Sequence, residues 1–200
     1  MTSQEALDYF LDNAHPYLKK MKELANSRGV KIIADPEEQF IYMPGGKVMI
    51  GWFMSDARPE NGGEFNMIAP IRGISYMFAN MPPSELVYFL EGQVIALSHE
   101  IGHVIDYCER EITDGRKYPG ICSFAAARPC LLREIRASFK AKKEVLPKII
   151  DNNELPRYIK LLVDFSREYF SNGLYDFCRR PSLNVNCREV CDKEMEAFLE

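Results

Sequence analysis

Two histidines with a glutamate between them constrain this chain more than any other feature of its sequence. His99 and His103 are four residues apart, so an α-helix places both imidazoles on one face. Glu100 lies about 100° around such a helix from His99, where its carboxylate can reach the same region without binding the same ion. This pattern alone predicts a helix that presents the three side chains together, although it can also arise by chance on a charged surface helix.

The surrounding residues predict a long helix with two different faces. A helical projection of residues 84–110 gathers apolar side chains on one side: Leu90, Val94, Leu97, Ile101, Val104, Ile105 and Cys108. The opposite side carries Gly92, His99, His103, Asp106 and Arg110. A chance pair of histidines on a surface helix would lie among Lys and Glu side chains. We therefore interpret this segment as a helix that lines an active-site cleft and binds Zn²⁺ through His99 and His103.

A zinc site of this kind needs a third protein ligand, and the chain has few histidines to supply it. The pattern His-Glu-x-x-His is typical of zinc-dependent hydrolases. Its extension by Gly-x-x-His would require glycine where Asp106 stands and histidine where Glu109 stands, so metzincins are excluded. Only His15 remains besides the motif pair, because the chain has three histidines. We therefore expect a carboxylate as the third ligand, as in gluzincins.

Glu134 is the best candidate for that carboxylate. A helix through this region places it on a face of small and apolar residues, namely Cys130, Leu131, Ala137, Ser138, Ala141 and Val145. A carboxylate on such a face must be paired, protonated or bound to metal. The alternatives are a salt bridge from Glu134 to an arginine, or Asp106 as the ligand. We prefer Asp106 as an acceptor for a ligand imidazole, and Glu109, Glu111 and Asp114 are weaker candidates.

The two motifs together resemble those of the ImmA/IrrE family of zincin-like metallopeptidases. That family pairs a His-Glu-x-Gly-His helix with a later Glu-x-x-Ala-x-x-x-Ala helix that ends near a proline. Residues 99–103, Glu134 with Ala137 and Ala141, and then Pro147 match this pattern over roughly residues 85–147. The resemblance implies a gluzincin-type metallopeptidase from a family associated with cleaving repressor proteins. The chain departs from the family in Asp106, in helices continuing to residue 200, and in lacking a recognisable helix-turn-helix.

The expected mechanism is hydrolysis of a peptide or protein substrate. Zinc held by His99, His103 and Glu134 would lower the pKa of a bound water towards ~7. Glu100 would act as the general base and pass the proton to the leaving amine. We assign no residue to the oxyanion, because Tyr107, Tyr118, Tyr158 and Tyr169 are each expected to be ordinary core or surface aromatics. The alternatives are a non-catalytic zincin-fold module and a metal-dependent amidase acting on a non-protein substrate.

The fold predicted from the pattern is α+β and zincin-like. It would be a single domain over residues 1–200, with an N-terminal helix, a small mixed β-sheet and a central active-site helix up to residue 111. A C-terminal helical lobe over 112–200 would supply the third ligand. In the first part we expect a helix over 4–27 interrupted at His15-Pro16, and strands within 30–33, 39–43, 47–54 and 64–68. A helix capped by Ser84 should follow. After a loop over 112–129 we expect helices near 130–146, 153–171 and 187–199, with Gly173 as a C-cap. Residues 64–69 are the first candidate for an edge strand that binds substrate, and 47–54 the second.

Composition indicates a cytoplasmic enzyme domain. A chain of 200 residues, 46% of them hydrophobic, can bury one sizeable core. The net charge of −4 gives no reason to expect nucleic acid as a partner, and we interpret the basic face around Arg133 and Lys143 as a solvated helix face. No secretory signal is predicted at the N-terminus, and no apolar run reaches the ~20 residues of a membrane span. The six cysteines are expected to be reduced thiols, with disulfides or a second metal site as the alternatives: Cys108, Cys122, Cys130, Cys178, Cys187 and Cys191.

Overall fold

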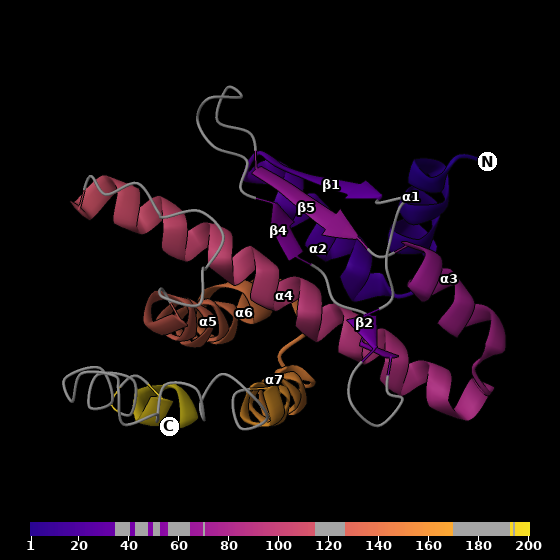
Figure 1. The fold of residues 1–200 in the computed structure, drawn as a ribbon. Coiled ribbons are helices and arrows are strands. Elements are labelled where there is room, and N and C mark those ends of the chain that lie inside the picture. The colour runs from indigo at the N-terminus through magenta and orange to yellow at the C-terminus, as the bar shows by residue number, and fades with distance from the viewer. Residues whose placement is uncertain are drawn as a thin grey trace. The chain divides into compact units, whose positions relative to one another are not determined.

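The structure is a computed structural model, and Figure 1 draws its helices and strands. The chain divides into two compact units, Met1–Glu100 and Ile101–Glu200. It describes residues 1–34, 41–42, 48–49, 53–55, 65–69, 71–114, 127–169, 193 and 195–200. The boundary between the units falls inside one long helix, whereas the sequence predicted a division after residue 111. The prediction of a single domain over the whole chain stays a prediction.

The first unit begins with two helices, α1 (Ser3–Asn13) and α2 (Pro16–Ser27). Thr2 and Glu5 form a reciprocal capping box at the start of α1, which satisfies two backbone N–H groups that have no partner within the helix. The Nδ1 atom of His15 accepts a hydrogen bond from the Tyr17 N–H at 3.3 Å and so caps α2. This confirms the predicted interruption at His15-Pro16, and gives His15 a role in local structure.

A three-stranded sheet follows these helices in the first unit. Its order is β1-β5-β4, with β1 (Val30–Ala34) parallel to β5 (Phe65–Ala69) and β4 (Phe53–Ser55) antiparallel to β5. A separate antiparallel pair joins β2 (Ile41–Tyr42) to β3 (Val48–Met49). The prediction of residues 64–69 as an edge strand is wrong, because β5 pairs on both sides. The second candidate, 47–54, divides between β3 and β4, and β4 lies at an edge of the three-stranded sheet.

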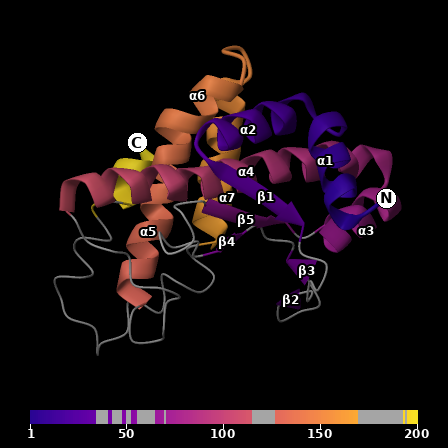
Figure 2. The same ribbon diagram turned by 90° about the horizontal axis from the view of Figure 1, so that it is seen from above.

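The core of the first unit lies between its helices and the sheet. Both α1 and α2 contact β1, and Figure 2 shows them beside that strand. Helix α3 (Ile71–Asn80), which the sequence did not predict, joins this core where the ring of Phe78 meets that of Phe10 edge to face at 6.1 Å. The buried apolar residues are Leu7, Phe10, Leu11, Tyr17, Leu18, Met21, Ala25, Val30, Ile32, Ala34, Ala69 and Ile74.

The motif helix, α4, spans Pro83–Asp114 without interruption (Figure 2). The Pro82 carbonyl accepts hydrogen bonds from the N–H groups of Glu85 and Leu86, so the helix begins one residue before Ser84. The predicted cap at Ser84 is wrong, because Pro83 has a fixed φ that suits the first helical position. The predicted apolar face is buried at Leu90, Val94, Leu97, Ile101, Val104 and Ile105. None of the helices among the described residues combines the length and apolar character needed to cross a membrane.

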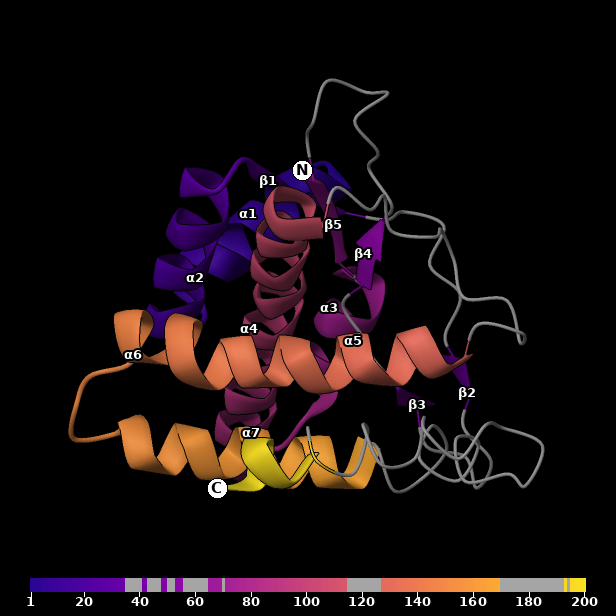
Figure 3. The ribbon, with the colours of Figure 1, turned by 90° about the vertical axis from the view of Figure 1, so that its left-hand side faces the viewer.

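In the second unit, three consecutive helical segments form a continuous rod, and a further helix packs beside it (Figure 3). The rod comprises α5 (Ala127–Lys140), the π-helical segment η3 (Ala141–Val145) and α6 (Leu146–Ile149), where the sequence predicted one helix over 130–146. Helix α7 (Leu155–Tyr169) contacts α5 and α6 and matches the helix predicted over 153–171. Residues 195–199 are helical, while Gly173 lies outside the described residues.

Buried polar side chains form hydrogen bonds between the helices of this second unit. The hydroxyls of Ser138 and Ser166 lie 3.0 Å apart and join α5 to α7. Lys142, in η3, donates from Nζ to the Phe198 carbonyl at 2.7 Å. The core around them consists of Ile101, Val104, Ile105, Ile135, Ala137, Ala141, Val145, Leu146, Ile149, Ile150, Tyr158, Leu162 and Phe198.

Candidate metal centre

Three side chains of α4 come together as the sequence predicted. One potential ligand atom from each of His99, Glu100 and His103 lies within 4.8 Å of the other two. His99 is 5% exposed and the His103 side chain 10% exposed, so neither imidazole lies on an open, solvated helix face. This burial favours a helix that lines a functional site over a chance pair of surface histidines.

Helix α5 brings the predicted third ligand, Glu134, to the same histidine. Its Oε1 atom lies 3.4 Å from Nε2 of His103, and the Glu134 side chain is 21% exposed. A charge-assisted hydrogen bond between these groups would typically be about 2.7–2.9 Å long. Two ligands about 2.0–2.1 Å from one tetrahedral zinc are roughly 3.3–3.4 Å apart. The separation is therefore longer than a direct charge-assisted hydrogen bond and is compatible with two ligands of one metal ion.

The close approach of α5 to α4 depends on a glycine inside the motif. Figure 3 shows α5 running across α4, and the two helices meet at Gly102 and Ala137. A Cβ atom on Gly102 would lie 2.1 Å from the Ala137 carbonyl oxygen. Sequence reasoning placed Ala137 on the face of Glu134 but did not identify Gly102 as its partner. The available signal was the pairing of a glycine in one motif with alanines in the other.

A second contact links the two helices beyond this crossing. Lys140 of α5 places Nζ 2.6 Å from Oε2 of Glu109 in α4 and 2.8 Å from Oε1 of Glu144 in η3. Burial opposes the charge on Lys140, but hydrogen bonds and charges from Glu109 and Glu144 outweigh it and raise the pKa of the lysine above its usual 10.5. Glu109, a weak ligand candidate from sequence, is therefore engaged with a lysine.

The structure describes the side chains of some of the other predicted site residues, tyrosines and cysteines. Asp106 is buried, at 6% exposed, and its role beside a ligand imidazole stays a prediction. Tyr158 is 1% exposed and is a core aromatic, as expected. Cys108 is a reduced, partly exposed thiol. The side chains of Tyr107, Tyr118, Tyr169, Glu111, Asp114 and the other five cysteines lie outside the described residues.

Two carboxylates are thus candidates to complete a metal site with the histidines. Glu100 lies in the group formed along α4, and Glu134 reaches His103 from α5. Comparison of the chain with protein-family models, curated proteins and solved structures gives no match.

Proposed function

We propose that this chain is a zinc-dependent peptidase with an α+β, zincin-like fold. The observation that carries the proposal is the 3.4 Å separation between Nε2 of His103 and Oε1 of Glu134, two residues from different helices. The remaining ligand is His99, which lies four residues before His103 on α4. Two imidazoles and one carboxylate form the ligand set of a catalytic zinc, which leaves a fourth position for water or substrate.

The two carboxylates then take different roles. Glu134 would hold the metal from a second helix, α5, where it lies beside His103. Glu100 follows His99 directly on α4, so its side chain points about 100° away from that imidazole. Its carboxylate lies close to both histidines, which suits a general base that acts on a water molecule. We assign Glu134 as the ligand and Glu100 as the general base.

The reaction follows from these assignments. When bound, zinc supplies Lewis acidity that lowers the pKa of water and polarises a carbonyl group. Glu100 accepts a proton as water attacks the carbonyl carbon of the scissile peptide bond. Glu100 then donates that proton to the amine nitrogen as the carbon–nitrogen bond breaks, and so returns to its ionised state.

The decisive experiment combines metal analysis with a conservative change of the base. Wild-type protein expressed in zinc-replete medium should contain about one zinc per chain. A peptide-library assay should detect cleavage that a zinc chelator stops. Glu100→Gln should keep the zinc and the circular dichroism spectrum of the wild type but lose activity by ~10²–10⁴-fold, because the amide cannot accept the proton.

The outcomes separate this proposal from its alternatives. Less than ~0.2 zinc per folded chain would contradict the site itself. Full zinc content without cleavage of any peptide or unfolded protein would favour a metal-dependent amidase or a zincin-fold module without catalysis. Equal biological activity in the wild type and in Glu100→Gln would identify the module, since only catalysis requires the base.

A further inference from the structure

Two glycines of α4 have opposite surroundings. Gly92 is exposed, and a Cβ atom there would meet nothing within 4 Å. A Cβ atom at Gly102 would lie 2.1 Å from the Ala137 carbonyl oxygen, 2.9 Å from its carbonyl carbon and 3.2 Å from its Cα. All three of these atoms belong to the backbone, so no flexible side chain can yield. A side chain at Gly102 would therefore force α5 away from α4, whereas one at Gly92 would displace nothing.

The displacement would act directly on the candidate ligands. Gly102 precedes His103, and Ala137 lies three residues after Glu134, within one turn of α5. To move from 2.1 Å to an ordinary contact distance of about 3.4 Å, the Ala137 carbonyl would have to retreat by about 1.3 Å. A protein ligand has to lie within about 0.2 Å of its proper distance from zinc. A shift of α5 by several times that tolerance would draw Glu134 away from His103.

We propose that Gly102 is a positioning residue for the metal site. Its lack of a side chain lets the α5 backbone approach α4 closely enough for Glu134 to join His99 and His103 around one ion. The inference rests on the proposed zinc site. It adds that the site requires close packing of α5 against α4 as well as the three ligands. Gly102 itself contacts neither metal nor substrate in this role.

The test compares alanine at the two glycines of the same helix. Zinc affinity is measured by competition with a chromophoric chelator, together with the thermal midpoint of the zinc-free protein. Gly102→Ala should weaken zinc binding by about 10- to 100-fold, the range found when groups that orient metal ligands are lost. Gly92→Ala should keep the wild-type zinc affinity and raise the thermal midpoint, because alanine suits an exposed helix better than glycine.

A double variant distinguishes positioning of Glu134 from a general loss of structure. In a Glu134→Ala background, adding Gly102→Ala should cause no further loss of zinc affinity, since the ligand that Gly102 positions is already absent. A further loss of 10-fold or more in that background would contradict the inference. If Gly102→Ala does not fold, Ala137→Val replaces it, because Ala137 is fully buried and a larger side chain there must also shift α5.

The remaining outcomes separate this inference from the proposed function. Zinc affinity of Gly102→Ala within about threefold of a zinc-binding wild type would overturn the inference and leave the zinc site intact. Equal losses in Gly92→Ala and Gly102→Ala would also overturn it, because the effect would then belong to α4 as a whole. A wild type that binds no zinc would overturn the proposed function and this inference together.

Discussion

Lys22 and Lys140 have nearly the same electrostatic surroundings in the two compact units. Each is about one-fifth exposed and lies within 3.0 Å of carboxylate oxygens from two acidic residues. Burial opposes the charge of both lysines, but the hydrogen bonds and charges of the carboxylates outweigh it, so both pKa values are raised. Charge and burial alone therefore do not distinguish the two networks.

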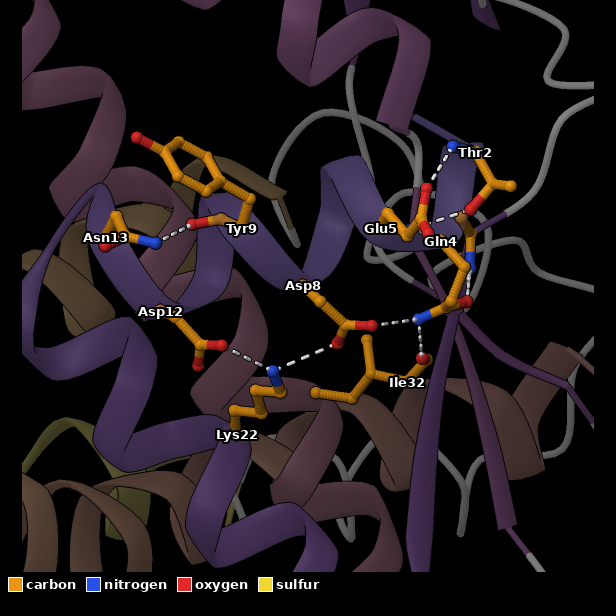
Figure 4. Close-up of polar contacts among 10 residues, drawn as sticks. Thr2, Gln4, Glu5, Asp8, Tyr9, Asp12, Asn13, Lys22 and Ile32 are labelled. Atoms are coloured by element: carbon orange, nitrogen blue, oxygen red, sulfur yellow. Dashed lines mark hydrogen bonds and ion pairs between the residues drawn. The ribbon is translucent and has the colours of Figure 1, made fainter.

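The difference lies in which elements each lysine connects. Lys22 of α2 reaches Asp8 and Asp12, which are one turn apart on α1 (Figure 4), and so joins two helices that carry no candidate ligand. Lys140 connects α5 to Glu109 on α4, the two helices that carry the candidate ligands. The same local chemistry thus supports the fold in one unit and the crossing of the ligand-bearing helices in the other. Substitutions should separate these roles.

The largest effect is expected at the ligands themselves. His99→Ala, His103→Ala and Glu134→Ala should each weaken zinc binding by more than ~100-fold, because loss of a ligand exceeds the ~10–100-fold cost of losing a group that only orients one. Lys22→Met is the control and should bind zinc as the wild type does. The measurement is competition for zinc against a chelator of known affinity. Full zinc retention by Glu134→Ala, together with loss in Asp106→Ala, would transfer the third ligand to Asp106.

The sequence predicted the parts of this arrangement that depend on local periodicity. The motif helix and its buried stripe from Leu90 to Ile105 follow from spacing within one element. Glu134 was identified because a carboxylate stood among small and apolar residues on one helix face. His15-Pro16 marked the break between α1 and α2 because proline suits a helix start and histidine can cap it.

The features that were missed depend on contacts between distant residues or on competing local signals. The central position of β5 follows from pairing with both β1 and β4, and strand order is not encoded in the pattern of any one strand. Gly102 and Ala137 are far apart in sequence, so only the helix crossing joins them. Helix α3 was missed because Gly73 and a run of apolar and aromatic residues resemble no clear helical pattern. Lys142 is buried in a π-helical segment, where an α-helical projection loses its register.

A smaller effect is expected from the two matched lysines. Lys140→Met and Lys22→Met should each lower the free energy of unfolding by up to about 1 kcal/mol, since the partner carboxylates are partly exposed. Only Lys140→Met should also weaken zinc binding, by up to about fivefold, which corresponds to the same ~1 kcal/mol. Chemical denaturation and zinc competition on both variants provide the comparison. Equal zinc affinity in the two variants would show that the Lys140 contact serves stability alone.

The smallest effect separates Lys140 from its near neighbour Lys142. Burial, followed by the charge of Lys143, lowers the pKa of Lys142, although Glu200 opposes this shift. Between its folded pKa and 10.5 the unfolded chain binds more protons at Lys142, so this group favours the folded state increasingly as pH rises. For Lys140 the sign is opposite, because its stabilisation is complete below 10.5 and is lost as pH rises through its raised folded pKa. The free energy of unfolding should therefore be measured at several pH values up to 10.5. As pH rises, the wild type should become more stable relative to Lys142→Met, whereas its stability relative to Lys140→Met should stay constant. A constant difference from both variants would mean that Lys142 is hydrated like an exposed lysine, despite its hydrogen bond to the Phe198 carbonyl.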